Sequence, residues 1–198
     1  TDVELDVDQP VTKDCGNCRL CIDACPTDAL DEAYHLAAER CIAYLTIEHR
    51  GPIDVELRPK LGEWVFGCDI CQEVCPYNAS TRGRPPGWAE FEPRLGTRLD
   101  LEATLALDEQ TFAATFRGSP INRAKRRGLA RNAALVLGNQ AQPTTPRARR
   151  GTQADSATGH ALERAADDPD PIVRDAAEWA LARLPRAKGA TPLPLLEL

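Results

Sequence analysis

The chain has 198 residues and a formal net charge of −6 at pH 7, which allows one large or two small domains and excludes a protein that is basic throughout. No apolar run approaches the roughly 18 residues of a membrane span, and no secretory or lipidation signal is visible, so we expect a cytoplasmic protein without a membrane partner. The chain contains no methionine and begins at Thr1, so we expect a processed chain or, in better agreement with the motifs below, a piece of a larger one.

Composition divides the first half of the chain into three segments. Residues 1–14 are acidic, and the weak alternation in VELDVDQPV predicts a strand. Residues 15–78 hold all eight cysteines. Residues 79–98 are rich in Gly, Pro and Arg and are typical of a linker. The cysteine-bearing segment is therefore bounded by an acidic segment on one side and a linker-like segment on the other.

The second half of the chain has the periodicity of antiparallel helix pairs. Asp108 is placed to cap a short helix over DEQTFAATF, with Gly118 near its end. A helical stripe in residues 122–139 consists of Leu129, Ala133, Val136 and Leu137.

A polar loop separates these helices from a final pair. ALERAADD precedes a DPDP turn, and PIVRDAAEWALARL begins with Pro171, which suits the first turn of a helix. This pattern resembles the HEAT repeat, a stacked two-helix unit, and an ordinary small helical bundle is the alternative. TPLPLLEL at the end predicts a loosely attached tail.

The cysteine spacing favours metal clusters over disulfides. Cys15, Cys18, Cys21 and Cys25 are separated by two, two and three residues, and Pro26 follows, as in the bacterial ferredoxin run. Cysteines this close point their sulfurs around a common centre, which suits a metal and strains a disulfide network. The pattern indicates a reducing compartment. Zinc is the weaker alternative, because three-residue spacings that end in proline are not zinc-ribbon pairs.

Two 4Fe-4S cubes need eight thiolates, and the chain has eight cysteines. In two-cluster ferredoxins the first three cysteines of a run hold one cube and the fourth crosses to the other. The second run, Cys68, Cys71 and Cys75 before Pro76, is one cysteine short, and Cys41 supplies it from a separate, helical element. The predicted ligands are Cys15, Cys18, Cys21 and Cys75 for the first cluster and Cys25, Cys41, Cys68 and Cys71 for the second. The alternative is a merely buried Cys41 beside a 3Fe-4S centre.

Such a module delivers electrons singly to an acceptor, and nothing in this sequence is an obvious acceptor. It has no dinucleotide-binding glycine fingerprint and no haem-attachment motif. His35, His49 and His160 match no metal motif and are interpreted as surface or hydrogen-bonded histidines. We therefore expect an electron relay with an external low-potential donor.

One segment departs from the acidic average. Residues 117–150 contain nine Arg and Lys residues and no Asp or Glu, which makes the segment a candidate anion- or nucleic-acid-binding surface. The alternative is a solvated, helix-favouring arginine face.

Four stretches resemble one known family, the epoxyqueuosine reductases: RCIAYLTIEHRGPI at 40–53, GEWVFGCDICQEVCPYN at 62–78, FRGSPINRAKRRGLARNAALVLGN at 116–139 and PIVRDAAEWAL at 171–181. The resemblance implies reduction of the epoxide of epoxyqueuosine at the tRNA wobble position, with cobalamin and two 4Fe-4S clusters. It also implies three parts: an N-terminal cobalamin domain with the catalytic aspartate, a ferredoxin-like domain, and HEAT-like helices that help to hold tRNA. This chain matches the second and third parts, so we expect a C-terminal portion that is inactive alone.

The resemblance also implies two sets of contact residues. Ala43 stands where the family often has Ser, which puts a minor cofactor contact in doubt. The predicted cobalamin-facing residues are Ala43, Phe66, Gly67 and Asp69. The predicted tRNA-contacting residues are Arg50, Arg117, Ser119, Arg123, Lys125, Arg126, Arg131 and Asn132, with Arg127 in the same stretch and RARR at 147–150 less certain.

The sequence therefore predicts an α+β protein. Residues 1–90 form a ferredoxin-like domain with two 4Fe-4S clusters, and residues 91–198 form an all-α HEAT-like domain with the tRNA-contacting segment. We expect a monomer. The competing hypotheses are a stand-alone two-cluster ferredoxin and a fragment of a corrinoid reductive dehalogenase, and the acid-free basic segment argues against both.

Overall fold

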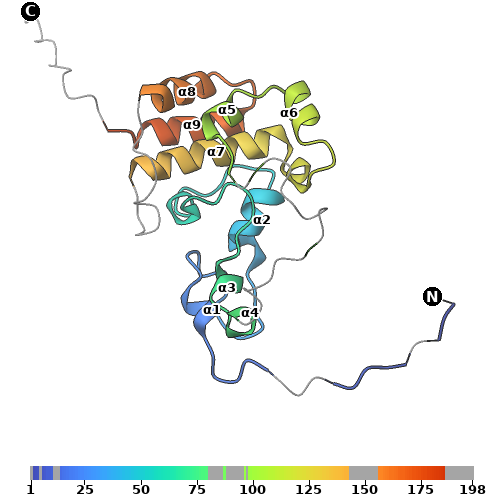
Figure 1. Ribbon diagram of the computed structural model, residues 1–198. Helices are drawn as coiled ribbons and strands as arrows, with labels where there is room; N and C mark the ends of the chain where they lie inside the picture. Colours follow the sequence, from blue (N-terminus) through green and yellow to red (C-terminus); the bar gives the residue numbers. More distant parts are fainter. Residues whose placement is uncertain are drawn as a thin grey trace, which may run out of the picture.

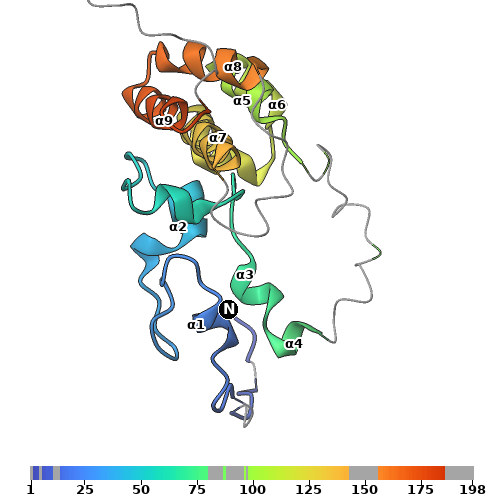
Figure 2. The same ribbon diagram turned by 90° about the vertical axis from the view of Figure 1, so that its left-hand side faces the viewer.

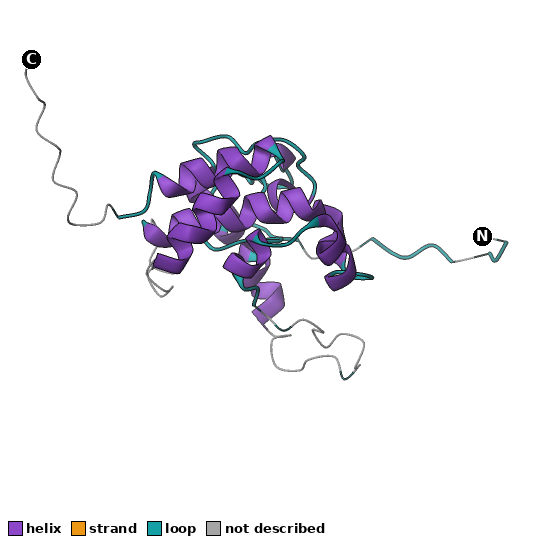
Figure 3. Cartoon of the chain, turned by 90° about the horizontal axis from the view of Figure 1, so that it is seen from above, coloured by secondary structure: helices purple, strands orange, loops and turns teal. Residues whose placement is uncertain are grey.

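The structure is a computed structural model that describes residues 2–4, 6–10, 14–79, 87, 96, 98–142 and 156–185. Within these ranges the chain forms helices and connecting segments and no strand (Figure 3). The α+β prediction is therefore wrong for this part of the chain. The described residues of VELDVDQPV are exposed and have no neighbouring strand, and an isolated extended segment leaves its backbone groups to water. RARR at 147–150 and TPLPLLEL lie outside the described residues.

The two cysteine runs fold into similar short helices. α1 (Leu20–Asp23) and α3 (Ile70–Glu73) are four-residue turns that begin between the cysteines of each run, and α4 (Pro76–Ala79) follows directly. The backbone N–H of Cys25 bonds the carbonyl of Ile22 at 3.2 Å, and that of Cys75 bonds the carbonyl of Gln72 at 3.3 Å. The equal spacing therefore produces an equal local structure, and α1 packs against α3.

The segment after Cys41 forms the middle of the molecule. η1 (Ala38–Arg40) leads into α2 (Ile42–Ile47), and η2 (Arg58–Leu61) follows after a loop. In Figures 1 and 2, α2 lies between the α1, α3 and α4 end and the larger helices above.

The remaining helices form a packed group. They are α5 (Leu101–Leu105), α6 (Glu109–Thr115), η4 (Pro120–Ala124), α7 (Lys125–Ala141), α8 (Ser156–Ala166) and α9 (Pro171–Leu181). Aspartate side chains cap three of them: Asp100 accepts from the N–H of Ala103, Asp108 from that of Thr111 and Asp170 from that of Ile172. The predicted cap at Asp108 and the predicted start of the last helix at Pro171 are confirmed.

The main apolar core joins the middle segment to these helices. Ile42, Leu45, Ile53 and Leu61 belong to the same buried cluster as the inner faces of α7, α8 and α9. We call residues 42–65, 98–142 and 156–185 the helical body, and residues 14–41 and 66–78 the cluster arm. In the cluster arm only Thr27 and Ala29 are buried. The boundary near residue 90 stays a prediction, and the core itself extends to both sides of it.

Helix α7 is the centre of the helical body. It packs against α9, α5, α2, η2 and η4, and most of its residues are buried rather than one stripe of them. Its first turn is held by a buried ion pair between Arg126 and Asp168, which precedes α9. No helix in the described ranges has the length and apolarity to cross a membrane.

Candidate functional site

The four cysteines predicted for the second cluster come together from three segments. Partial burial raises the pKa of the Cys68 thiol, and the negative charges of Cys41, Cys71 and Cys25 raise it further. Burial likewise raises the pKa of Cys71, to which the charge of Cys41 adds. Cys25 and Cys41 therefore lie near enough to Cys68 for their charges to act on it, and the binding of one cluster by all four cysteines stays a prediction.

Cys25 has an environment that favours the thiolate. Burial acts to raise its pKa, but hydrogen bonds outweigh burial and the pKa lies below its usual range. The N–H of Ala29 donates to the Cys25 sulfur at 3.3 Å, and the Thr27 hydroxyl lies 3.7 Å from it. A sulfur that receives several hydrogen bonds in its charged form suits an iron ligand.

The four cysteines predicted for the first cluster occupy the outer part of the arm. Cys15 and Cys18 are exposed, and Cys21 and Cys75 are half-buried. The Tyr77 hydroxyl, just beyond Cys75, donates to the carbonyl of Asp14, just before Cys15, at 2.9 Å. This bond ties the end of the second run to the start of the first, and the crossed ligand assignment stays a prediction.

All eight cysteines are free thiols in the structure. Within the described residues, no three His, Cys, Asp or Glu side chains are grouped so that they could hold a single metal ion. A 4Fe-4S cube needs more widely separated thiolates than a single metal ion does, because each thiolate binds its own iron at a separate corner.

The predicted cobalamin-facing residues lie near the second cluster set but differ in availability. The N–H of Gly67 donates to the Thr46 hydroxyl at 2.9 Å, and Phe66 packs against the smaller apolar cluster of Phe112 and Phe116. Asp69 is exposed and Ala43 is half-buried. Asp69 and Ala43 therefore remain accessible at this edge, whereas Gly67 and Phe66 already have internal partners.

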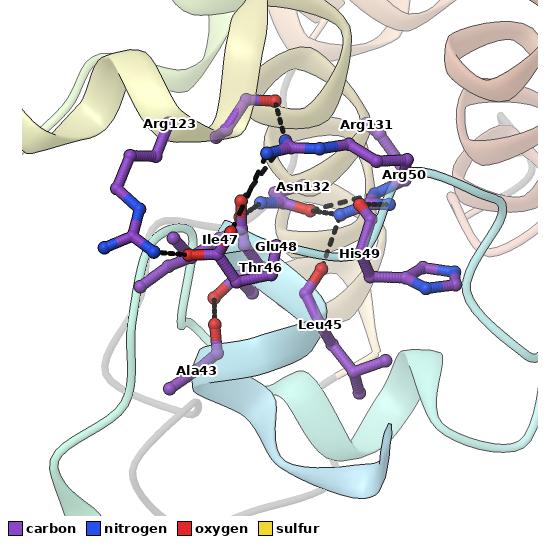
Figure 4. Close-up of polar contacts among 11 residues, drawn as sticks. Ala43, Leu45, Thr46, Ile47, Glu48, His49, Arg50, Arg123, Arg131 and Asn132 are labelled. Carbon is purple, nitrogen blue, oxygen red and sulfur yellow. Dashed lines mark hydrogen bonds and ion pairs between the residues drawn. The ribbon is translucent and has the colours of Figure 1, made fainter. Parts of the chain in front are cut away.

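Three of the predicted tRNA-contacting residues point inward, so the prediction of direct contact is corrected for them. Arg131 is 1% exposed, Asn132 0% and Arg126 8%. The Arg131 and Asn132 side chains bond to backbone carbonyls around α2 (Figure 4), and Arg126 bonds to Asp168 and to the carbonyl of Leu107. A run of arginines predicts positive charge, but it does not tell which of them the fold buries.

The other predicted residues lie at or near the surface at one end of α7. Arg117, Arg123, Lys125 and Arg50 are exposed, and Arg127 is partly exposed. The Ser119 hydroxyl caps η4 by accepting from the N–H of Ile121 at 3.3 Å. Glu48 pairs with both Arg123 and Arg50, so an acidic side chain lies within this basic surface.

Sequence reasoning missed Thr46 and Glu48, which join the site to the helical body. Thr46 is buried and bonds both to its own helix and to Gly67. Nothing in the sequence distinguishes a buried threonine of functional importance from one that only packs. The charged Glu48, which follows the last residue of α2, was the one available indication that the helix ends here.

Comparisons with known proteins show what the chain is similar to. A family model described as a 4Fe-4S double cluster binding domain matches residues 14–78. Epoxyqueuosine reductase from Alicycliphilus denitrificans is 38% identical over 183 residues, which cover 92% of this chain and 49% of that protein. The Pseudomonas aeruginosa protein of the same name is 41% identical over 188 residues, with coverages of 91% and 48%. The chain thus spans about half the length of the curated relatives it matches.

Solved structures give the same relation. An epoxyqueuosine reductase crystallised with an epoxyqueuosine-modified tRNA-Tyr stem loop matches with a TM-score of 0.75 and 31% identity, over 90% of this chain and 44% of that one. The enzyme of Streptococcus thermophilus matches with a TM-score of 0.70 and 30% identity, over 92% and 45%. By sequence and by fold, the chain therefore belongs to the epoxyqueuosine reductase family and carries a 4Fe-4S double cluster binding domain.

Proposed function

We propose that this chain is the electron-relay and tRNA-binding portion of an enzyme that reduces epoxyqueuosine to queuosine at the tRNA wobble position. One observation carries the proposal: Cys25 and Cys41, from two other segments, lie near enough to the second cysteine run for their charges to act on Cys68, and that of Cys41 also on Cys71. Cys41 belongs to the 40–53 stretch, which generic ferredoxins lack, so this grouping favours the family's cluster site over an ordinary ferredoxin.

The chain's own residues would hold two clusters in unlike surroundings. Cys15, Cys18, Cys21 and Cys75 would bind the first and Cys25, Cys41, Cys68 and Cys71 the second. When bound, such cubes store and pass on single electrons at low potential. The protein shields the second cluster by half-burying all four ligands, and it stabilises the Cys25 thiolate by hydrogen bonds.

Cobalamin belongs to this proposal as a group shared with the rest of a full-length enzyme, which would also carry the catalytic acid. The accessible edge at Ala43 and Asp69, beside the second cluster set, fits such a neighbour. When bound, cobalamin supplies a strongly reducing cobalt centre. In this chain Thr46 would orient the edge, since its hydroxyl holds the N–H of Gly67.

The tRNA contact would involve the basic surface formed by Arg50, Arg117, Arg123 and Lys125, with Ser119 beside it. Such side chains bind phosphates and position the RNA without reading its sequence. The solved relative bound to a tRNA stem loop supports this part of the proposal. Arg126, Arg131 and Asn132 are excluded from it because their donors are used internally.

The proposal further includes a cytoplasmic monomer with an external low-potential electron donor. A HEAT-like arrangement of α8 and α9 and the domain division near residue 90 also remain part of it. The packing of α8 against α9 and of α9 against α7 supports the helical part.

The test is cluster content after anaerobic reconstitution of the chain. Two cubes give about eight iron and eight sulfide per chain. Replacing Cys41 with Ser should remove about half of each, because one cube is deprived of a ligand while the other keeps all four. An unchanged content in Cys41→Ser would contradict the assignment, and a content of about four in the unaltered chain would contradict the two-cluster proposal.

Binding of a tRNA anticodon stem loop tests the second half of the proposal. Replacing Arg123 and Lys125 with Ala should weaken binding, because each of these cations neutralises a phosphate. The slope of log affinity against log salt should become shallower by about one for each phosphate that is no longer neutralised. An unaltered chain that does not bind the stem loop at low salt would contradict a tRNA role.

A further inference from the structure

The end of α2 presents backbone carbonyls that its own helix cannot satisfy. The last carbonyls of a helix lack an N–H partner one turn further on. Here the carbonyl of Leu45 accepts from Arg131 at 2.6 Å, that of Thr46 from Asn132 at 2.8 Å and that of Ile47 from Arg50 at 3.3 Å. Two of these three caps come from α7, more than eighty residues away in sequence.

Arg131 uses its whole guanidinium for this purpose. Besides Leu45, it donates to the carbonyls of His49 at 3.0 Å and Gly51 at 2.6 Å, and twice to the Asn132 amide oxygen at 3.0 and 2.9 Å. These five bonds equal the donor capacity of an arginine, and none of the acceptors is a carboxylate. A buried cation held by carbonyls alone fixes the orientation of those carbonyls closely.

Asn132 and Thr46 connect the helix end to a second segment. The Asn132 amide nitrogen donates to the carbonyls of Thr46 at 2.8 Å and of Val65 at 2.9 Å. The Thr46 hydroxyl donates to the carbonyl of Ile42 at 2.7 Å and accepts from the N–H of Gly67 at 2.9 Å. The 65–67 turn is thereby attached to α2 at two points (Figure 4 shows the α2 side).

Each of these segments leads directly to a predicted ligand of the second cluster. Cys41 precedes α2, and its carbonyl accepts from the N–H of Leu45 at 2.9 Å. Cys68 follows Gly67. Whatever sets the distance between α2 and the 65–67 turn therefore sets the separation of two thiolates that bind the same cube.

We propose that Arg131 and Asn132 are positioning residues of the second cluster, acting with Thr46 to fix Cys41 and Cys68 relative to each other. This inference rests on the proposed function, because it requires the cluster that those cysteines bind. The basic helix α7 thus has a second duty: it carries no cysteine, yet it supports the two segments that bear these ligands. Groups that orient metal ligands typically change metal retention by about 10- to 100-fold when they are removed.

The fold offers a matched control on the same helix. Asn139 is 1% exposed and also donates its amide to two carbonyls, those of Arg58 at 2.9 Å and Gly62 at 3.1 Å. That segment bears no cysteine. Asn132→Ala and Asn139→Ala therefore remove the same atoms and two amide-to-carbonyl bonds each, but only the first touches the cluster site. Asn132→Ala also removes the amide oxygen that accepts two bonds from Arg131.

The experiment is an anaerobic redox titration of the reconstituted chain, followed by electron paramagnetic resonance, together with the rate of iron loss to a chelator. The reduction step that is absent in Cys41→Ser identifies the second cluster. We expect Asn132→Ala to shift the midpoint of that step and to speed loss of the second cluster about tenfold or more. Asn139→Ala should leave both readings unchanged.

Thr46 provides a second, milder pair of variants if Asn132→Ala does not fold. Thr46→Val removes the hydroxyl at nearly constant shape and should shift the same step, whereas Thr46→Ser keeps the hydroxyl and should not. Equal shifts in Asn132→Ala and Asn139→Ala, or no difference between the two Thr46 variants, would overturn the inference while leaving the proposed function intact. A chain that takes up no second cluster would overturn both.

Discussion

The cluster arm and the helical body are held together by different means. The helical body has a continuous apolar core that includes Leu61, Leu162 and Val173, all fully buried. The cluster arm buries only Thr27 and Ala29, and its helices are single turns. A short helix without a core is marginal in water, so the arm depends on metal ligation for its order, whereas the body depends on burial of apolar surface. We therefore expect the arm to become ordered as the clusters are loaded, and the body to fold independently of them.

Metal removal should produce the largest difference between the cluster arm and the helical body. Stripping iron should unfold the arm and leave the body folded, because only the arm lacks a core. Hydrogen exchange should show reduced amide protection in residues 15–40 and 68–78 and retained protection in α7 and α9. An equal reduction of protection in both regions would contradict the division.

Breaking the buried ion pair of the body should give the next largest effect. Arg126→Met leaves Asp168 without its cationic partner, and such changes cost about 3–5 kcal/mol of unfolding free energy. Urea unfolding followed by circular dichroism measures this, and cluster content should not change. Arg127→Ala is the control, since its ion pair with Asp170 spans 4.0 Å at a partly exposed site and is worth about 1 kcal/mol or less.

The same pair should make the body sensitive to acid. Burial acts to raise the pKa of Asp168, but hydrogen bonds from Arg126 and the Asp170 N–H lower it overall. A carboxyl with a lowered folded pKa contributes stability above its unfolded pKa of about 3.9, and that contribution disappears as the pH falls through the folded value. Asp168→Asn should therefore flatten the fall of unfolding free energy below about pH 4. If the pH dependence of the unfolding free energy were unchanged in this variant, the ion pair would not be the source of the acid sensitivity.

Two glycines of α7 should respond to alanine in opposite directions, with smaller effects. A Cβ at Gly138 would lie 2.9 Å from the Cα of Ala180 and 2.9 Å from the Trp179 ring, so Gly138→Ala should destabilise the fold by about 1 kcal/mol despite its better helix propensity. At Gly128 the nearest atom is the Ala124 Cβ at 3.7 Å, so Gly128→Ala should stabilise it by about 0.5–1 kcal/mol. Denaturant midpoints of the two variants provide the measurement.

The smallest expected effect lies in the arm. His35 and Asp31 are exposed partners 2.5 Å apart, and the hydrogen bond and charge of Asp31 raise the pKa of His35. The raised pKa means that this pair is fully formed below the unfolded histidine pKa of about 6.5 and disappears as the pH rises through the folded value. An NMR titration of His35 should show the raised pKa, and Asp31→Asn should return it towards the reference value.

The sequence predicted the parts of the molecule whose chemistry is local. Cysteine spacing predicted the cluster site, and Asp108 and Pro171 predicted helix starts, because caps and loops act over a few residues. It did not predict the absence of a paired strand in the described residues near the N-terminus, because pairing depends on a distant partner. It also assigned Arg131 to the surface, because charge alone does not reveal that carbonyls from residues 45–51 surround it.

The carbonyl-lined arginine limits how this chain can be dissected. A protein cut near residue 90 would leave Arg131 in the C-terminal piece without the acceptors that residues 45–51 supply, and would expose the face that covers Ile42 and Leu45. An open apolar face of this kind favours aggregation. A cut near residue 41, between the two cysteine runs, would keep these interactions within one piece. It would, however, separate Cys15, Cys18, Cys21 and Cys25 from the other four predicted ligands, so the two parts of the chain are best expressed together.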